Sequence, residues 1–303
     1  MQATKKIWMN GKMVPWKAAQ VHFLTHSLHY GSAVFEGIRC YSTKKGPAVF
    51  RLHEHIDRLL DSAKIVGMAV PFTHKQLFDA CRKVVRENKL KECYIRPLAF
   101  YDYGKMGLNP IGAKVSVGIA AWPWGPYLGK DGVAKGIRVK ISSFARHHPN
   151  VTMTKAKVTG NYANSILAKT EVVKAGYDEA IMLDTMGFVS ECTGENLFLV
   201  KDGVLITPPL STVLEGITRA SLLEVAMDSG LEVVEERLTR DQLYVADEVF
   251  LCGTAAEVTP VREIDDRKVG KGKPGPVTKL LQKKYDEIIH GRDECYLDWL
   301  DLV

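Results

Sequence analysis

Residues 154–165 read TKAKVTGNYANS, and this stretch places two lysines, Lys155 and Lys157, ahead of a glycine. If residues 153–158 form a strand, alternate side chains share a face, so both lysines point the same way. Most lysines in strands face water, and strand geometry does not distinguish one lysine from the other. A chemical role for either lysine therefore depends on what the rest of the chain supplies.

The composition is that of an ordinary soluble globular protein, with 303 residues, 46% of them hydrophobic and 25% charged. The net charge of +6 is spread thinly, because no basic run exceeds two residues and acidic residues are interleaved, so we expect no nucleic-acid partner. The most apolar window, 115–124, is too short to cross a bilayer, so we expect no membrane association. Six cysteines occur singly, without a CxxC pair, which indicates a reducing, cytoplasmic location.

The order of the elements favours an α+β protein of two domains. Helical patterns occur singly among several successive strand-like runs, unlike the strict alternation of a doubly wound sheet. Asn10-Gly11 between two apolar runs predicts a hairpin, and Thr73 with Gln76 predicts a helix start. The expected strands are 37–41, 93–101, 115–122, 137–144, 179–183, 196–200, 231–237 and 248–252, and the expected helices are 53–66, 73–88, a segment after GNY ending near 176, 217–230 and 277–289.

The stretch at 123–136, PWGPYLGKDGVAKG, is dense in glycine and proline and shows no periodicity, which is typical of a connection between domains. We therefore expect a small N-terminal domain at residues 1–122, a connecting loop at 123–136 and a larger, strand-rich domain at 137–303.

Two local patterns resemble motifs of other binding sites, but the residues around them do not fit those sites. GKGKPG at 270–275 matches a dinucleotide-binding GxGxxG, but no strand follows its helix and Pro274 lacks an amide hydrogen, so we interpret it as a hairpin turn before a helix. His22, His26 and His29 would line one face of a helix, as metal ligands do, but no nearby acid supports them. We expect structural histidines and no metal site.

Two stretches predict binding sites for an anion. In LEGITR, 214–219, Gly216 precedes a helix whose first amides, those of Ile217 and Thr218, have no acceptor within the helix. In GTAAE, 253–257, a strand ends in a glycine turn that offers the Thr254 hydroxyl and a row of amides.

A carboxylate completes the set, since VSECTGENLF places Glu191 at a strand end among small residues. A lysine, an anion site and a carboxylate are what pyridoxal 5'-phosphate requires: an amine for its aldehyde carbon, anchors for its phosphate, and an anion beside its pyridine nitrogen.

With these features the chain closely resembles the class IV, fold-type-IV pyridoxal-phosphate aminotransferases, and within them the branched-chain amino acid aminotransferases. The resemblance runs from about Ile7 to the C-terminal DWLDLV, and it implies a two-domain fold-type-IV enzyme whose larger domain binds the cofactor. The activity implied is reversible transfer of the amino group of leucine, isoleucine or valine to 2-oxoglutarate. The motifs are HYGSAVFEGIRCY, EHIDRLLDSAKI, YIRPL, MGLNP, PWGPYLG, AKVTGNYANS, SECTGENLF, EGITR and GTAAEVTPV.

The resemblance also implies roles for cofactor residues. Lys157 is the lysine that bonds to the cofactor, whereas Lys155 stands at a variable family position and keeps its interpretation as a solvated lysine. Tyr162 would meet the phenolic oxygen of the cofactor, and Glu191 the pyridine nitrogen. The phosphate would be held by Arg58, the amides of Ile217 and Thr218 that follow Gly216, and the hydroxyl of Thr254.

For the substrate, the resemblance implies three groups of contacts. The α-carboxylate would meet Thr254, the Ala255 amide and Tyr94. Arg96 would bind the second carboxylate of glutamate and pack its stem when no carboxylate is present, assisted by Tyr30 and by the Leu108 amide of the partner subunit. A contribution from a partner subunit implies a homodimer, possibly assembled into a trimer of dimers. The apolar pocket would consist of Phe35, Gly37, Trp124, Tyr127 and Tyr162.

Three alternatives stay open at this stage. D-amino acid aminotransferase and aminodeoxychorismate lyase share the fold and cofactor, and YIRPL and GTAAE favour the branched-chain enzyme over both by resemblance. A basic binding protein without catalysis belongs to a different class. It would be colourless when purified, whereas an enzyme that holds pyridoxal phosphate on a lysine is yellow.

Overall fold

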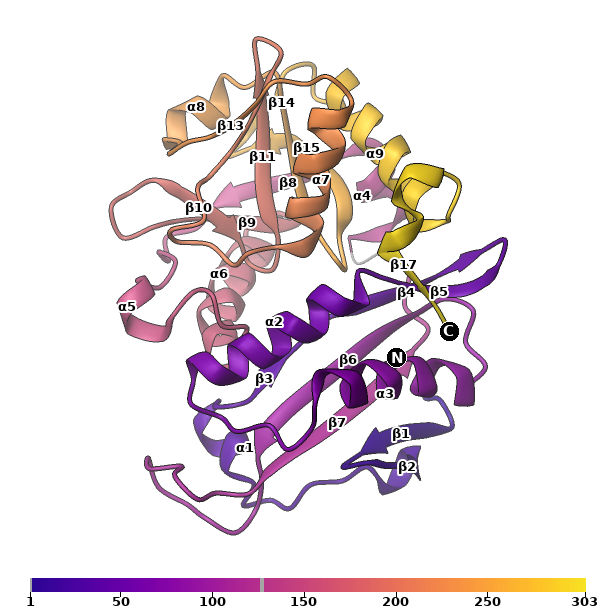
Figure 1. Ribbon diagram of the computed structural model, residues 1–303. Coiled ribbons are helices and arrows are strands. Elements are labelled where there is room, and N and C mark those ends of the chain that lie inside the picture. Colours follow the sequence, from indigo (N-terminus) through magenta and orange to yellow (C-terminus); the bar gives the residue numbers. More distant parts are fainter. Residues whose placement is uncertain (1, 126–127) are drawn as a thin grey trace. The chain divides into compact units, whose positions relative to one another are not determined.

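The computed structural model describes residues 2–125 and 128–303, except for the side chain of Lys130 (Figure 1). The chain forms two compact units. The first consists of residues 1–124, 156–161 and 288–303, and the second of residues 125–155 and 162–287. The chain therefore leaves and re-enters the first unit, and the predicted domains at 1–122 and 137–303 with their connection at 123–136 stay a prediction.

In the described residues, the first unit contains an eight-stranded antiparallel sheet of order β17-β5-β4-β6-β7-β1-β2, with β3 paired to β6. Its strands are β1 Lys6–Met9, β2 Lys12–Pro15, β3 Val34–Phe35, β4 Ile38–Thr43, β5 Gly46–Phe50, β6 Cys93–Tyr101, β7 Val115–Trp122 and β17 Leu300–Leu302. Its helices are η1 Trp16–Ala18, α1 His26–Tyr30, α2 Leu52–Ile65, α3 His74–Glu87, η2 Thr159–Asn161 and η3 Glu294–Trp299.

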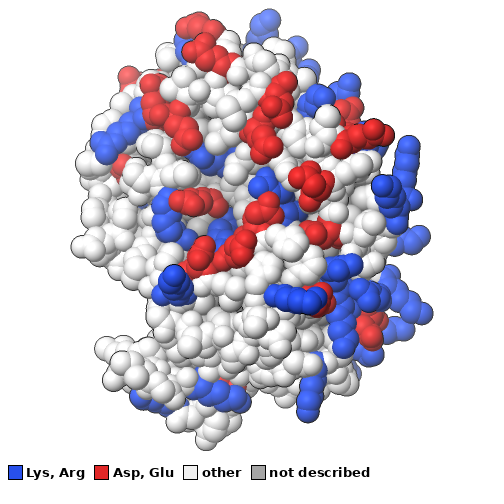
Figure 2. Space-filling view, viewed as in Figure 1, with Lys and Arg blue, Asp and Glu red and all other residues white. Residues whose placement is uncertain are grey.

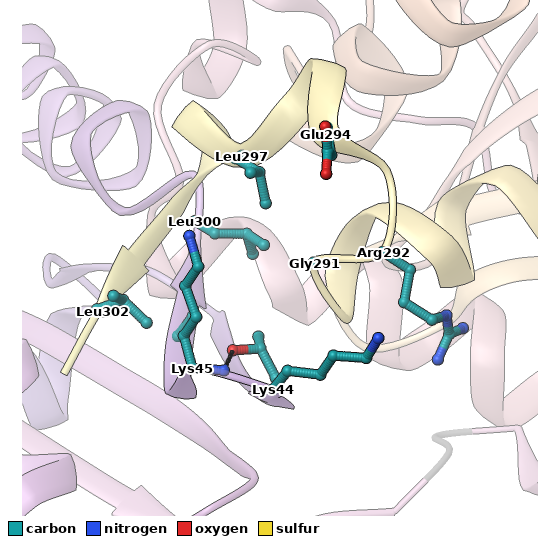
Figure 3. Close-up of a pocket in the computed structure, with 10 residues that line it drawn as sticks. Lys44, Lys45, Gly291, Arg292, Glu294, Leu297, Leu300 and Leu302 are labelled. Atoms are coloured by element: carbon teal, nitrogen blue, oxygen red, sulfur yellow. Dashed lines mark hydrogen bonds between the residues drawn. The ribbon is translucent and has the colours of Figure 1, made fainter.

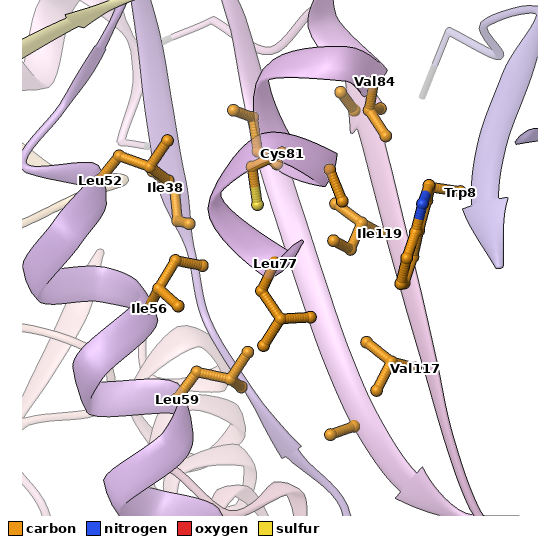
Figure 4. Close-up of a cluster of buried hydrophobic side chains, with 14 of the residues drawn as sticks. Trp8, Ile38, Leu52, Ile56, Leu59, Leu77, Cys81, Val84, Val117 and Ile119 are labelled. Atoms are coloured by element: carbon orange, nitrogen blue, oxygen red, sulfur yellow. The ribbon is translucent and has the colours of Figure 1, made fainter. Parts of the chain in front are cut away.

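Helices α2 and α3 form the core of this unit with the sheet (Figure 4). The apolar residues of α2 recur at helical spacing, so Ile56 and Leu59 point at the strands together. The predicted start of α3 is confirmed, because the Thr73 side chain accepts from the Gln76 amide and Gln76 bonds back to the Thr73 amide. This packing fixes α2, which contains Arg58, against the sheet.

The N-terminal hairpin is also confirmed. Strands β1 and β2 pair across Asn10-Gly11, where both residues have positive φ angles of 45° and 90°. A two-residue turn with this backbone matches the twist of the strands, and asparagine followed by glycine adopts it at little cost.

The second unit contains a nine-stranded mixed sheet of order β10-β9-β8-β15-β14-β11-β12-β13, with β16 paired to β15. Pairs β8–β9, β8–β15 and β12–β13 are parallel and the others are antiparallel. Its strands are β8 Ile137–Ile141, β9 Glu179–Leu183, β10 Val189–Cys192, β11 Asn196–Lys201, β12 Val204–Thr207, β13 Val233–Glu235, β14 Glu248–Gly253, β15 Glu257–Ile264 and β16 Arg267–Lys268. The helices are α4 Gly129–Lys135, α5 Pro149–Thr152, α6 Tyr162–Lys174, α7 Ile217–Asp228, α8 Arg240–Tyr244 and α9 Pro276–Ile289.

Single helices among successive strands of a mixed sheet confirm the α+β class. Helix α6 packs on β9 through a small apolar cluster that includes Val172 and Met182. Helix α7 packs on β14, and its first turn carries the predicted anion site.

Residues 153–158 do not form a strand. Residues 154–156 form turns and a bend, and only Val158 makes a bridge, with Val34. The reason is that the Lys157 amide, which a strand would direct to a neighbouring strand, donates instead to the Ser62 hydroxyl at 3.0 Å. The two lysines therefore do not share a strand face.

Three further expectations need correction. Residues 129–135, expected within a loop, form helix α4 despite two glycines. Strand β8 ends at Ile141 rather than 144, because the Ser142 hydroxyl accepts from the Phe144 amide and turns the chain. The hairpin turn expected at 270–275 lies instead at Asp265–Asp266, between β15 and β16, while 270–275 forms the turn before α9.

Candidate active site

The backbone of Lys157 is held from two sides in the first unit. Its amide donates to Ser62 of α2 at 3.0 Å, and its carbonyl accepts from the Phe35 amide of β3 at 3.1 Å. The next residues continue the attachment, since the Thr159 amide donates to the Ala33 carbonyl at 2.8 Å. The Lys157 side chain leaves this clamped segment, and its Nζ lies 5.2 Å from the centre of the Phe35 ring. The position of the amine is therefore set by α2 and β3 and not by a strand of its own.

Arg58 lies on α2 and forms a two-point ion pair with Glu36. Its Nε donates to Glu36 Oε1 at 2.7 Å and its Nη2 to Glu36 Oε2 at 2.8 Å. His55, one turn earlier on α2, contacts the same carboxylate, with 2.7 Å between its Nδ1 and Glu36 Oε2. Sequence reasoning missed both partners, although FEGIR and EHIDR contain them.

Several of the residues expected to bind substrate lie in the first unit, with Phe35 on β3, Gly37 between β3 and β4, and Arg96 on β6. The Arg96 guanidinium lies 4.7 Å from the centre of the Phe35 ring, and its Nη2 donates to the Tyr94 hydroxyl at 3.2 Å. The rings of Tyr94 and Trp124 are 4.6 Å apart. Gly37 has no room for a side chain, because a Cβ there would lie 1.9 Å from the Tyr94 hydroxyl. Arg96 is therefore bordered by aromatic rings, and an arginine in this setting can contact either an apolar side chain or a carboxylate.

Tyr30 and Leu108 lie together on the first unit. The Tyr30 hydroxyl accepts from the Gly107 amide at 3.2 Å, and His26 Nε2 lies 2.9 Å from the Gly107 carbonyl. Leu108 itself is 86% exposed. The expectation that Tyr30 and the Leu108 amide serve the site of a partner subunit stays a prediction.

Glu191 is a buried carboxylate in β10 of the second unit. Its Oε1 lies 2.7 Å from Arg146 Nη2, and both side chains are almost fully buried. Its Oε2 accepts from the Leu214 amide at 3.2 Å and from Asn196 Nδ2 at 3.4 Å. One cation and two neutral donors thus surround the carboxylate. Asn196 could have been found five residues after Glu191 in SECTGENLF, whereas the sequence around Arg146 gives no signal.

Gly216 lies directly before the first turn of α7. Gly216 is the N-cap and supplies no side-chain acceptor for the amides of Ile217 and Thr218. A Cβ at Gly216 would lie 1.9 Å from Asn196 Oδ1, and the same Asn196 donates to the Leu214 carbonyl at 3.1 Å. A Cβ at this position would therefore require the Asn196 side chain to move.

Other predicted residues are placed separately. Thr254 and Ala255 follow β14 in a half-buried turn, and Tyr162 begins α6. Lys155 belongs to the second unit, where its Nζ lies 3.0 Å from Glu215 Oε1 and also contacts the Leu210 carbonyl. It is therefore engaged in an ion pair instead of pointing only at water. Tyr127, expected in the apolar pocket, lies outside the described residues.

The ring nitrogens of the N-terminal histidines contact other groups of the protein. His29 Nε2 lies 2.9 Å from the Phe23 carbonyl, and His22 Nδ1 accepts from the Leu24 amide. In the described ranges no group of three His, Cys, Asp or Glu side chains is arranged to hold a metal ion. The absence of a metal site stays a prediction.

Two surface features lie apart from these residues. A cavity of about 420 Å³ in the first unit is lined by Lys44, Lys45, Arg292 and several leucines, and no predicted site residue borders it (Figure 3).

Figure 2 shows acidic and basic side chains interspersed on the visible face, and ion pairs such as Arg138–Glu263 at 2.7 Å agree with this mixing. No helix in the described part of the chain is long and apolar enough to cross a membrane. The absence of a nucleic-acid partner stays a prediction.

Known proteins are similar over the whole chain. A family model described as amino-transferase class IV matches residues 33–264. The chain is 51% identical to the branched-chain-amino-acid aminotransferase of Pseudomonas aeruginosa over 297 residues, which cover 98% of this chain and 97% of that protein.

Two solved structures share the fold. The crystal structure of the Escherichia coli branched-chain amino acid aminotransferase matches with a TM-score of 0.97 at 50% identity, and covers 99% of both chains. The branched-chain amino acid aminotransferase of Thermobaculum terrenum, solved in its PLP-form, matches with a TM-score of 0.91 at 36% identity, and covers 98% of this chain and 97% of that chain.

Proposed function

Because the chain belongs to the amino-transferase class IV family, we propose that it is a fold-type-IV branched-chain amino acid aminotransferase. It exchanges the amino group of leucine, isoleucine or valine with 2-oxoglutarate, which gives the branched 2-oxo acid and glutamate. The observation that carries this function is identity at about half of all positions, over nearly the full length, to enzymes named for it. The membership also removes the alternative of a binding protein without catalysis.

The residues present fit pyridoxal phosphate as the cofactor. Lys157 supplies an amine from a fixed backbone. Glu191 supplies a buried carboxylate whose charge Arg146 balances, which is the partner that a protonated pyridine nitrogen needs. When bound, the cofactor draws negative charge away from the substrate α-carbon.

Lys157 and Glu191 handle protons at two different atoms. Lys157 Nζ would take the proton from the substrate α-carbon and deliver it to the C4′ carbon of the cofactor, and its clamped backbone keeps the amine in reach of both atoms. Glu191 accepts a hydrogen bond from the pyridine nitrogen and favours its protonated form. The ion pair with Arg146 and the donors from Leu214 and Asn196 hold that carboxylate in one orientation.

Several elements contribute groups that bind the phosphate. Arg58 contributes its guanidinium from α2, and Ile217 and Thr218 contribute amides at the first turn of α7. The Thr254 hydroxyl contributes from the turn after β14, and Tyr162 meets the phenolic oxygen of the cofactor. These roles rest on the donor set and on the matched family motifs.

The substrate pocket serves two unlike side chains. Branched apolar chains pack on Phe35 and Trp124 beside Gly37, together with Tyr127 and Tyr162. The second carboxylate of glutamate meets Arg96, which already lies between aromatic rings. The α-carboxylate meets Tyr94, Thr254 and the Ala255 amide.

Exposed apolar side chains support a homodimer as the working form. Phe23, Leu108 and Ile111 are 75%, 86% and 79% exposed, and all belong to segments that flank Tyr30 or Gly107. Large apolar side chains gathered at one end of a unit favour burial against another subunit. Tyr30 and Leu108 of the partner subunit would then complete the Arg96 end of the pocket. A trimer of dimers is the larger assembly that we propose for solution.

The location that we propose is the cytoplasm, because the described chain has six free cysteines and five of them are buried.

A donor panel tests the function. The purified chain is mixed with pyridoxal phosphate, 2-oxoglutarate and one amino acid at a time, and glutamate is measured. L-leucine, L-isoleucine and L-valine should each support turnover well above L-alanine and D-alanine. Turnover from D-amino acids alone would favour the D-amino acid aminotransferase instead, and no turnover from any donor would reject the proposal. Lys157→Ala is the inactive control.

A further inference from the structure

We propose that Glu36 is a positioning residue that fixes the guanidinium of Arg58, and that the pair sets the preference of this protein for a phosphorylated over an unphosphorylated cofactor. The inference rests on the proposed function, in which Arg58 meets the phosphate. It concerns Glu36 and His55, to which no role has been given above.

The geometry at Glu36 is that of a carboxylate held in one place. Its backbone lies between β3 and β4, where its amide donates to the Pro97 carbonyl at 3.0 Å, and its side chain is fully buried. Oε2 accepts from Arg58 Nη2 at 2.8 Å and lies 2.7 Å from His55 Nδ1, while Oε1 accepts from Arg58 Nε at 2.7 Å. The Gly37 amide adds a longer contact of 3.3 Å to Oε2. Neither oxygen can move without losing a donor.

The charges of the network are settled by burial and contact. Burial alone would raise the pKa of Glu36, but the charge and hydrogen bond of Arg58 and the hydrogen bond of His55 hold it well below its usual range. Burial lowers the pKa of His55 against the contrary effect of Glu36. Because the Glu36 carboxylate can only accept, Nδ1 of His55 donates this hydrogen bond. The ion pair of Glu36 and Arg58 is thus neutral as a whole.

Because the Glu36–Arg58 pair has no net charge, it favours a phosphate less by its charge than by the fixed orientation of the Arg58 N–H donors. An arginine has five N–H donors in a planar fork, and Glu36 takes one from Nε and one from Nη2. The opposite edge, which contains Nη1, is therefore turned to one fixed side of α2. An arginine without this partner would sample several rotamers, and ordering it on binding would weaken the contact with phosphate. Glu36 contributes by removing that freedom in advance.

The alternative is a purely structural pair that ties α2 to the sheet. Such a pair would affect all ligands of the site alike, whereas a positioning residue affects only ligands with a phosphate. The ratio of the affinities for pyridoxal phosphate and pyridoxal separates the two roles.

The test uses the full-length chain freed of cofactor and titrated calorimetrically with pyridoxal phosphate and with pyridoxal. Glu36→Gln keeps the shape and removes the charge. We expect its affinity for pyridoxal phosphate to fall at least about tenfold and its affinity for pyridoxal to change less than about twofold. Glu54→Gln is the matched control, because Glu54 on α2 also pairs with an arginine, the N-cap residue Arg51, and is 40% exposed. Its two affinities should stay those of the wild type.

Equal weakening of both ligands by Glu36→Gln, or no weakening, would overturn the inference. A wild-type chain that does not prefer pyridoxal phosphate over pyridoxal would instead reject the proposed function itself.

If Glu36→Gln does not fold, a pair of substitutions at His55 decides. His55→Asn keeps a donor near the position of Nδ1, and His55→Leu removes it. We expect His55→Leu to lower the affinity ratio about threefold or more and His55→Asn to restore it. The same ratio in both variants would contradict a positioning role for this network.

Discussion

Replacing Arg96 by methionine should separate the two half-reactions of the proposed enzyme. The guanidinium lies 4.7 Å from the Phe35 ring and 5.3 Å from the Tyr94 ring, and it donates to the Tyr94 hydroxyl at 3.2 Å. Methionine keeps an unbranched apolar chain against these rings and removes the charge. The variant therefore leaves an apolar wall for a branched side chain and no partner for a second carboxylate.

The magnitude follows from the environment of Arg96. Leaving one partner of a buried charge pair without the other costs about 2–5 kcal/mol, and the lower half applies because Arg96 is only half-buried. A loss of about 2–3 kcal/mol corresponds to a fall of about 30- to 150-fold in kcat/KM for glutamate and 2-oxoglutarate. Leucine does not use the charge, so its half-reaction should change less than about threefold.

Single-turnover spectroscopy of each half-reaction measures both rates on one preparation. Arg82→Met is the matched control, because Arg82 also stacks on a ring, that of Phe78 at 5.6 Å, and has no predicted contact with substrate. It should leave both half-reactions unchanged. Equal losses for leucine and glutamate in Arg96→Met would refute the reasoning, since Arg96 would then shape the site or meet the α-carboxylate.

Two further substitutions test the second unit. Gly216→Ala sets a Cβ 1.9 Å from Asn196 Oδ1, so it should lower the free energy of unfolding by about 1–3 kcal/mol and weaken the binding of pyridoxal phosphate. Gly194→Ala is the control, because a Cβ there meets no atom within 4 Å, and it should change neither quantity. Denaturation measures the first quantity and titration with the cofactor the second. Burial first, and the charge of Glu179 second, raise the pKa of Glu195 from 4.5 to about 8, so the folded state keeps a proton that the unfolded state has lost. Stability should therefore fall as the pH rises from about 4.5 to 8, and denaturant titrations of Glu195→Gln should show a flatter decline than the wild type over that window; parallel curves would exclude the carboxyl as the cause.

Local sequence signals predicted the elements that local interactions build. Strands β6 and β7 begin and end at the predicted residues, and the capping box of α3 lies where Thr73 and Gln76 placed it. The hairpin at Asn10-Gly11 has the same origin, because its turn depends on two residues only.

Interactions between distant segments were not predictable in this way. The residues around Lys157 have strand-like composition, yet the amide of Lys157 bonds to Ser62, which lies on a helix far earlier in the chain. Glu36 and Arg146 are likewise defined by partners from other elements, Arg58 and Glu191. A single sequence shows which residues can pair, whereas the fold decides which of them do.

The central claim is that Lys157, and not Lys155, bonds to pyridoxal phosphate in a working aminotransferase. Reduction of the yellow full-length enzyme with borohydride fixes the cofactor to the lysine that holds it, and mass spectrometry of the peptides locates the added group. We expect a phosphopyridoxyl group on Lys157, with Lys155 unmodified in its pair with Glu215. The group on Lys155 or on any other lysine, or no modified lysine at all, would contradict it.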